Sequence, residues 1–388
     1  MLQVKDIYKA FGDNKVLNGV SLDIEQGAFV SLLGPSGCGK TTLLKVIAGL
    51  EVPESGSIFI NGTCCDELPA RKRGAVIVFQ DYGLFPHMTV TQNIAFGLVA
   101  QKKEKSEREQ KISHMLDVMQ ISEKANSYPH ELSGGQKQRV ALARACVLEP
   151  NVLLLDEPFS NLDTGLRDVM REFVQELQRK LGITTVLVTH DKEEAFMLSQ
   201  KVAVIFDGSV QQYDTPIEIY TRPKTKQVSD FIGEANYIDG AFDGKYFCCP
   251  FGKFETSSAQ NGKIEVTDIQ NSELSVIQNR EPSVKQNSEP SVKQNDKKKL
   301  MVRYDQFHME AASEAVYETA LETSCEINTA NAVKCEILEK TFKGRITTYR
   351  VQPLEGLETE IRINTSNANF EQGDKVFVTV KSGAGHVI

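Results

Sequence analysis

The segment Gly34–Thr42, with the sequence GPSGCGKTT, restricts the fold of this chain more than any other feature. The apolar run FVSLL at Phe29–Leu33 precedes it, and the helical pattern LLKVIAGL follows it. A strand, a glycine-rich turn and a helix in this order form a phosphate-binding loop, because the glycines let successive backbone N–H groups surround a polyphosphate. This context argues against a chance glycine-rich turn. The segment therefore predicts a nucleotide-binding α/β domain.

Within this loop, Lys40 is expected to reach the terminal phosphates of ATP, and Thr41 to offer its hydroxyl group to Mg²⁺. We expect the start of the following helix to favour the thiolate form of Cys38, which would make it a site of inhibitory alkylation. The predicted ATP contacts in the loop are Gly34, Pro35, Ser36, Gly37, Cys38, Gly39, Lys40, Thr41 and Thr42.

Two carboxylates follow a second apolar run. VLLLD ends at Asp156, Glu157 comes next, and Pro158 ends the strand. Ligands bind at the carboxyl edge of such sheets, so we expect Asp156 to hold Mg²⁺ through water and Glu157 to polarise the attacking water. A solvated turn is the alternative, and the apolar residues before the pair argue against it.

The pattern along the chain predicts two domains, since 388 residues are too many for one core. Apolar runs alternate with amphipathic segments up to about residue 232, as in an α/β domain with a largely parallel sheet covered on both faces. We assign residues 1–235 to this domain, with a helical subdomain at about 90–150. Residues 236–388 have the short β-rich segments of a small all-β domain. A low-complexity repeat at about 267–299 predicts a disordered insertion.

Composition narrows the function classes. Apolar residues make up 40% of the chain and charged residues 25%, as in ordinary soluble proteins. The apolar runs are shorter than the roughly 20 residues that span a bilayer, and the N-terminus shows no secretory signal. A net charge of −8 argues against nucleic acid as a partner. We therefore expect a cytoplasmic protein without a membrane span.

The segment LSGGQKQR, which begins at Leu132, discriminates among phosphate-transferring ATPases. Ser133 and Gln136 have the spacing of a capping box, and Gly134 and Gly135 allow close backbone approach at the start of a helix. Such an N-terminus suits an anion, although a plain helix cap would explain Ser133 equally well.

The order of the motifs resembles that of the ABC ATPase family over the whole first domain. Walker A, Gln80, the LSGGQ signature, Walker B, SNLD and His190 follow one another as in that family. The resemblance implies that two copies pair head to tail, so that Ser133–Gln136 of one copy closes on the ATP held by Lys40 of the other. It also implies that Gln80 senses Mg²⁺ and the attacking water. His190 is implied to contact the γ-phosphate and to hold Glu157 in line, although a lone histidine is more often structural.

The resemblance implies two further nucleotide contacts. Phe11 matches the position of an aromatic residue that stacks on adenine, and a buried phenylalanine is the simpler alternative. Asp163 in SNLD matches the residue that links the two sites across the dimer. Asn161 stands where most relatives carry alanine.

Other segments resemble those of importers. GLFPHMTVTQNIAFGL, after Gln80, resembles a surface that receives a helix of the membrane subunit, and the β-rich tail resembles a regulatory TOBE-like, oligonucleotide-fold module. The resemblance implies a homodimer, peripheral at the cytoplasmic face of the inner membrane. Its implied partners are permease subunits and an extracytoplasmic substrate-binding protein. GEANYIDG most resembles the ferric-iron branch, with polyamine, sulfate or molybdate importers as alternatives and a membrane-independent ABC ATPase as the alternative of another class.

Overall fold

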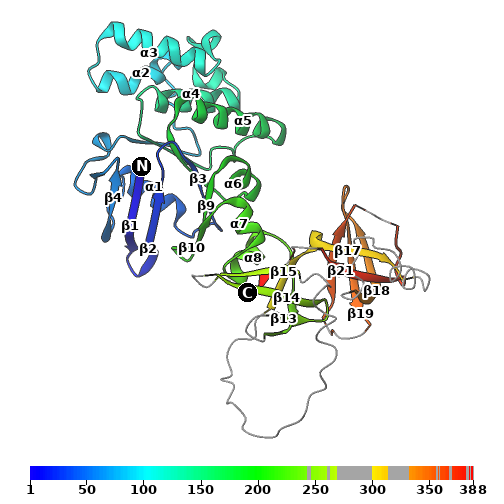
Figure 1. Ribbon diagram of the computed structural model, residues 1–388. Coiled ribbons are helices and arrows are strands. Elements are labelled where there is room, and N and C mark those ends of the chain that lie inside the picture. Colours follow the sequence, from blue (N-terminus) through cyan, green and yellow to red (C-terminus); the bar gives the residue numbers. More distant parts are fainter. Residues whose placement is uncertain are drawn as a thin grey trace. The chain divides into compact units, whose positions relative to one another are not determined.

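The computed structural model describes residues 1–242, 246–259, 263–268, 299–312, 332–354, 357, 359–366, 369–381, 384, 386 and 387. The chain divides into two compact units, Met1–Ile219 and Tyr220–Ile388 (Figure 1). The domain boundary predicted at residues 235 and 236 stays a prediction. The insertion predicted at about 267–299 lies outside the described residues, except for 267, 268 and 299. None of the helices in the described ranges is long and apolar enough to span a bilayer.

A six-stranded sheet forms the centre of the first unit. Its order is β10-β9-β3-β8-β7-β6, and all neighbours are parallel except β10 and β9. Its strands are β3 (Phe29–Leu33), β6 (Ala75–Val78), β7 (Val152–Asp156), β8 (Thr184–Thr189), β9 (Lys201–Phe206) and β10 (Ser209–Asp214). Every residue of β3, β7 and β8 is buried, as in a parallel sheet covered on both faces. The predicted α/β domain with a largely parallel sheet is confirmed.

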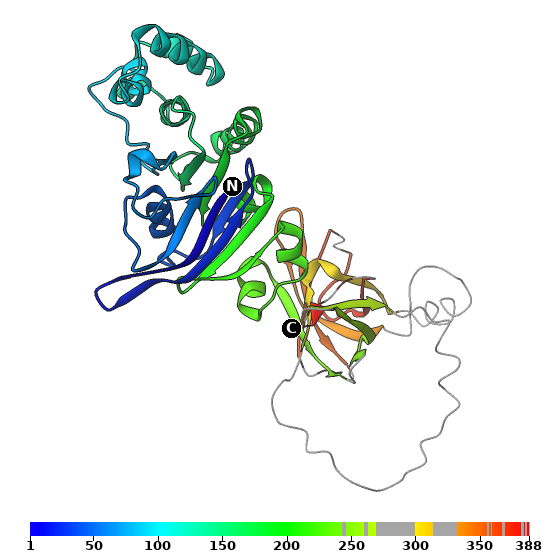
Figure 2. The same ribbon diagram turned by 60° about the vertical axis from the view of Figure 1, so that its left-hand side comes forward.

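An antiparallel sheet, in the order β2-β1-β4-β5, adds a second layer to this unit. Its strands are β1 (Leu2–Phe11), β2 (Asn14–Ile24), β4 (Ser55–Ile60) and β5 (Thr63–Cys64). Figure 2 shows the β1–β2 hairpin, in dark blue, extending beyond the rest of its sheet. The last residue of β1 is Phe11, which therefore lies beside the turn of the hairpin.

The helices of the first unit are α1 (Lys40–Ala48), α2 (Val90–Ala100), α3 (Lys105–Val118), α4 (Gly134–Cys146), α5 (Thr164–Leu181) and α6 (Lys192–Leu198). A further helix, α7 (Pro216–Thr221), spans the division between the units. Helices α2, α3 and α4 come between β6 and β7 in the chain and lie together at one end of the unit (Figure 1).

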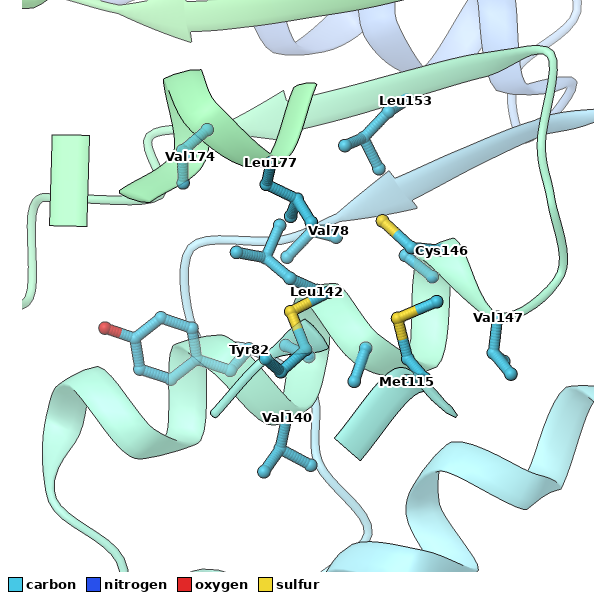
Figure 3. Packing of buried hydrophobic residues seen from close by; sticks show 14 of the residues in the cluster. Val78, Tyr82, Met115, Val140, Leu142, Cys146, Val147, Leu153, Val174 and Leu177 are labelled. Atoms are coloured by element: carbon cyan, nitrogen blue, oxygen red, sulfur yellow. The ribbon is translucent and has the colours of Figure 1, made fainter. Parts of the chain in front are cut away.

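One apolar core joins these helices to the sheet (Figure 3). Leu142 and Cys146 of α4 belong to it together with Met115 of α3, Leu153 of β7 and Leu177 of α5. Each large apolar side chain buried in this way contributes roughly 1.5–3 kcal/mol to stability. The same core contains Leu132, just before α4, and Val78, the last residue of β6, so it anchors the segments next to two of the predicted functional motifs.

The second unit is β-rich. Its largest sheet is antiparallel, in the order β17-β21-β18-β19-β20, and β19 alternates buried and half-buried residues, as a strand with one face on a core does. The elements are α8 (Lys226–Ile232), β11 (Ala235–Asp239), β12 (Ala241–Phe242), β13 (Tyr246–Cys249), β14 (Gly252–Ala259), β15 (Lys263–Asp268), β16 (Lys299–Arg303), β17 (Phe307–Ala311), β18 (Val333–Phe342), β19 (Thr347–Pro353), β20 (Ile361–Thr365), β21 (Lys375–Val380) and β22 (His386–Val387). The predicted β-rich character of the second domain is confirmed.

Candidate nucleotide-binding site

The phosphate-binding loop joins β3 to α1, and close packing requires glycine at two of its positions. A Cβ atom on Gly34 would lie 2.2 Å from the carbonyl oxygen of Ile205, and one on Gly39 would lie 2.5 Å from that of Val16. Gly39 also has a φ of 98°, a conformation that L side chains rarely adopt. The loop therefore turns tightly into α1, whose first N–H groups have no partner within the helix and suit a phosphate.

The Lys40 side chain lies against this loop and is only 5% exposed. Its Nζ atom donates hydrogen bonds to the carbonyl oxygens of Gly34 and Pro35, each at 2.7 Å. Both acceptors are uncharged, so they leave the positive charge of the ammonium group to act on an anion in the loop. Three other predicted contact residues, Pro35, Ser36 and Gly37, are exposed, while Thr42 is half-buried in α1.

The hydroxyl group of Thr41 donates a hydrogen bond of 2.9 Å to Oδ1 of Asp156. These residues are 115 positions apart, and the parallel sheet brings the ends of β3 and β7 to the same edge. Asp156 is 8% exposed; burial raises the pKa of its carboxyl group, and the Thr41 hydrogen bond opposes that rise. A buried carboxylate beside a hydroxyl group is an oxygen donor set that fits Mg²⁺, which would also stabilise the ionised form.

Glu157 follows Asp156 in an unusual backbone conformation, with a φ of 45°. Non-glycine residues seldom adopt a positive φ, so the neighbouring chain must hold this one in place. Its N–H donates to the carbonyl oxygen of Val188 at 3.0 Å, which ties the residue to the end of β8. His190 comes two residues after Val188, and its Nδ1 atom lies 3.2 Å from Oε1 of Glu157. The structure thus brings these two predicted catalytic residues into contact.

Gln80 lies on the wall of a cavity of about 890 Å³, which Thr41 and Asp156 also line. The same cavity continues to Phe85 and to residues of α2 and α4. The side-chain amide of Asn161 donates to the carbonyl oxygen of Gln80 at 2.8 Å and also lines the cavity. Sequence reasoning did not identify this contact, because no spacing rule pairs a loop amide with a backbone carbonyl 81 residues away.

The signature residues form the predicted capping box at the start of α4. The Ser133 side chain accepts from the N–H of Gln136 at 3.3 Å, and the Gln136 side chain accepts from the N–H of Ser133 at 3.0 Å. Cβ atoms on Gly134 and Gly135 would lie 3.2 Å from the side chains of Leu162 and Leu166, respectively. The glycines therefore allow close packing against the segment that leads into α5.

Asp163 occupies that segment as the N-cap of α5, where its side chain accepts from the N–H of Leu166 at 2.9 Å. Leu162, directly before it, and Leu166, three residues after it, are the leucines near the signature glycines. The structure thus brings Asp163 close to the signature segment, whereas Thr41, Gln80, Asp156, Glu157 and His190 form the other group of predicted residues.

Phe11 is 49% exposed at the end of β1, and the Nζ atom of Lys9 lies 4.8 Å from its ring centroid. The alternative of a buried phenylalanine is therefore wrong. A ring that is exposed to this extent can stack on another planar group.

The expectation of a reactive thiolate at Cys38 is also wrong. Its side chain is 7% exposed, and burial raises the pKa of the thiol. The ammonium group of Lys40, 3.7 Å from Sγ, lowers this pKa by less than burial raises it. Cys38 is therefore a neutral thiol packed under the loop rather than a reactive thiolate.

Comparison with known proteins agrees with this geometry. Residues 17–160 match the family model described as ABC transporter. A stretch of 256 residues is 48% identical to the Fe(3+) ions import ATP-binding protein FbpC of Fusobacterium nucleatum subsp. nucleatum, covering 66% of this chain and 69% of that protein. The chain belongs to the ABC transporter ATPase family. It is therefore an ATP-binding protein and an ATPase, as the motifs predict.

Solved structures of ABC proteins resemble part of the chain. The dimeric cassette MJ0796, in a post-hydrolysis state bound to ADP and Pi, is 31% identical with a TM-score of 0.50, covering 56% of this chain and 99% of that one. The protein cbiO1 of Clostridium perfringens, part of the ABC transporter complex cbiONQ, is 32% identical with a TM-score of 0.53, covering 56% of this chain and 89% of that one.

Proposed function

We propose that this ABC ATPase supplies the energy for an importer of ferric iron. The observation that carries the proposal is the similarity to the Fusobacterium protein, whose name states that it serves the import of Fe(3+) ions. The chain would act at the cytoplasmic face of the inner membrane as a peripheral subunit. Its partners would be a permease in the membrane and a substrate-binding protein outside it.

ATP binding would use the loop and the exposed ring. The N–H groups at the start of α1 and the ammonium group of Lys40 would hold the phosphates, because both present positive charge to the same loop. Phe11 would stack on the adenine from the β1–β2 hairpin. Glycine at positions 34 and 39 keeps the loop backbone in its tight turn.

Thr41, Asp156 and Gln80 would hold Mg²⁺, since all three line one cavity and offer oxygen atoms. When bound, the cation neutralises charge on the phosphates of ATP. Asn161 fixes the backbone of Gln80 by its hydrogen bond and would keep the Gln80 side chain at this edge.

Hydrolysis would use Glu157 as the general base. Its carboxylate would accept a proton from water as the water oxygen attacks the γ-phosphorus and the bond from phosphorus to the β–γ bridging oxygen breaks, leaving ADP and phosphate. The imidazole of His190, 3.2 Å from this carboxylate, would orient it and contact the γ-phosphate. Strand β7 ends at Asp156, and Glu157 follows it with a positive φ.

Two copies would share each ATP. The signature Ser133–Gln136 presents a capped helix start, and Asp163 lies beside it, so one surface carries both predicted dimer contacts. Dimeric structures of the similar cassette MJ0796 support this arrangement. The permease would dock where the cavity reaches Phe85 and α2, beside the magnesium edge.

The test is uptake of labelled ferric iron, and separately of spermidine, sulfate and molybdate, in cells that carry wild type, Glu157→Gln or a deletion. Glu193→Gln is the matched control, because it makes the same change at an exposed glutamate on α6. We expect both Glu157→Gln and the deletion to lose iron uptake alone, while Glu193→Gln retains it.

If the variants lost uptake of spermidine, sulfate or molybdate instead, that compound and not iron would be the transported substrate. Unchanged uptake of all four, together with co-purification of the chain with ribosomes or DNA, would favour a membrane-independent ABC ATPase. Measuring ATP binding by purified Glu157→Gln separates the catalytic role of Glu157 from ATP binding, since the substitution should block hydrolysis and leave binding intact.

A further inference from the structure

A buried arginine on α5 gathers three carboxylates near the end of β8. Arg171 is 5% exposed. Its Nη1 atom lies 3.0 Å from Oδ1 of Asp168, and its Nη2 atom lies 3.0 Å from Oδ2 of Asp191 and 3.1 Å from Oε1 of Glu194. The Asp168 side chain is 64% exposed and belongs to α5, whereas the Glu194 side chain is 6% exposed and belongs to α6. The two contacts of Nη2 therefore join α5 to the start of α6.

These contacts continue to both sides of His190. The hydroxyl group of Thr189 donates to Oε2 of Glu194 at 2.6 Å and accepts from the N–H of Asp191 at 2.9 Å. Oδ1 of Asp191 in turn accepts from the N–H of Glu193 at 2.8 Å, as the N-cap of α6. The residues before and after His190 are therefore both held by one hydrogen-bonded group.

His190 lies between the two residues that this group holds. Its side chain is 58% exposed, so close packing does not fix the ring. The Thr189 hydroxyl group bridges the backbone around His190, because it belongs to the residue before His190 and accepts from the N–H of the residue after it. A shift of about 1 Å at a reacting group can lower a rate about a hundredfold, so the bridge bears directly on hydrolysis.

We propose that Arg171, acting through Glu194, Asp191 and Thr189, is a positioning residue for His190 in ATP hydrolysis. The inference rests on the role proposed above for His190. It adds that the role requires the contacts that join α5 to the start of α6.

The experiment measures kcat and KM for ATP with the purified full-length chain. Thr189→Val keeps the side-chain volume and removes both hydrogen bonds of the hydroxyl group. Arg171→Met removes the shared guanidinium group. Asp168→Asn is the matched control, because Asp168 contacts the same arginine but not the segment around His190. We expect kcat to fall about tenfold to a hundredfold in the first two variants, with KM within about twofold, and to stay within about twofold in the control.

A double-mutant cycle separates positioning from a general structural effect. If Thr189 acts through His190, adding Thr189→Val to His190→Ala should change kcat by less than about twofold, since coupled residues are not additive. Imidazole ¹⁵N spectra provide a second readout: the His190 signals should move in Thr189→Val and stay in Asp168→Asn. The inference would be overturned if the losses of kcat in Thr189→Val and His190→Ala multiplied in the double variant. It would also be overturned if the His190 signals stayed unchanged in Thr189→Val, or if Asp168→Asn lost as much kcat as the first two variants.

The outcomes also separate this inference from the proposed function. Wild-type kcat in His190→Ala would remove the role proposed for His190. A loss in His190→Ala together with normal kcat in Thr189→Val would leave that role standing and refute the positioning by Arg171. Cargo does not enter the assay, so a failure of iron uptake changes neither result.

Discussion

Replacing Arg303 by methionine should destabilise the second unit strongly. Arg303 is completely buried, yet its guanidinium group faces backbone carbonyls. It donates four hydrogen bonds, two to Tyr220 O, one to Ser229 O and one to Gly233 O, at 2.6–3.1 Å. These carbonyls lie at or near the ends of α7 and α8, where helices leave acceptors unpaired. The Arg303 side chain, which belongs to β16, thus donates hydrogen bonds to carbonyl groups at the ends of two helices.

The magnitude follows from these bonds. Hydrogen bonds from a charged donor contribute about 1.5–3 kcal/mol each, but bonds that share one side chain are not additive. Methionine would leave these neutral carbonyl groups without the guanidinium donor, at about 1–3 kcal/mol for each unsatisfied group, and we expect a total of about 3–5 kcal/mol for Arg303→Met. Arg350→Met is the control. Arg350 pairs with Glu339 and Glu360 at the surface of the same unit, where such pairs contribute about 0–1 kcal/mol.

Calorimetry of the full chain can assign the loss to the second unit. ATP binds the first unit and should raise the free energy of unfolding of that unit by about 2.7 kcal/mol at a hundredfold excess over Kd. An unfolding transition whose midpoint temperature does not change with ATP therefore belongs to residues 220–388. A loss below about 1 kcal/mol in Arg303→Met, or one equal to that of Arg350→Met, would refute the reasoning.

Three further predictions concern the nucleotide site. Gly34→Ala should abolish ATP binding measured by titration calorimetry, because the new Cβ atom would lie 2.2 Å from a backbone carbonyl of β9; unchanged affinity would contradict this. Asp156→Asn should abolish ATPase activity and yet raise the Tm of the nucleotide-free protein. Burial raises the pKa of this carboxyl group above its value in the unfolded chain. The free energy of unfolding therefore falls as pH rises from the ordinary carboxyl pKa through the raised one, and above it the ionised Asp156 destabilises the folded state. The gain in Tm should therefore be present at neutral pH and disappear in acid, and a lower Tm at neutral pH would count against it. Asn161→Ala should lower kcat about fivefold, the equivalent of roughly 1 kcal/mol for one hydrogen bond, by releasing Gln80, and an unchanged kcat would show that the contact is dispensable.

Local features of the site could be predicted from the sequence alone. The turn at Gly34 and Gly39, the helix start at Lys40 and the capping box of Ser133 and Gln136 depend on residues within a few positions of one another. Their geometry follows from backbone sterics and from hydrogen bonds to adjacent N–H groups. The uninterrupted apolar runs likewise indicated strands buried on both faces, because only a covered sheet can exclude water from every residue of a strand.

Contacts between distant segments required the tertiary structure. Asn161 meets Gln80, and Arg171 meets Glu194, because the order of strands in the sheet places their loops and helices together, and no local rule specifies such pairs. The wrong expectation for Cys38 has the same origin. Sequence placed it at a helix start that favours a thiolate, but the surrounding strands bury it, and desolvation outweighs the charge of Lys40.

The sequence by itself determined the chemistry of this protein, since the phosphate-binding loop and the order of the motifs identify an ABC ATPase from residue types and spacing. The tertiary structure decided which side chains are exposed, as for Phe11, and which distant side chains meet, as for His190 and Glu157. Exposure and electrostatic environment depend on all the elements that pack around a residue. They therefore arise only when the folded chain brings those elements together.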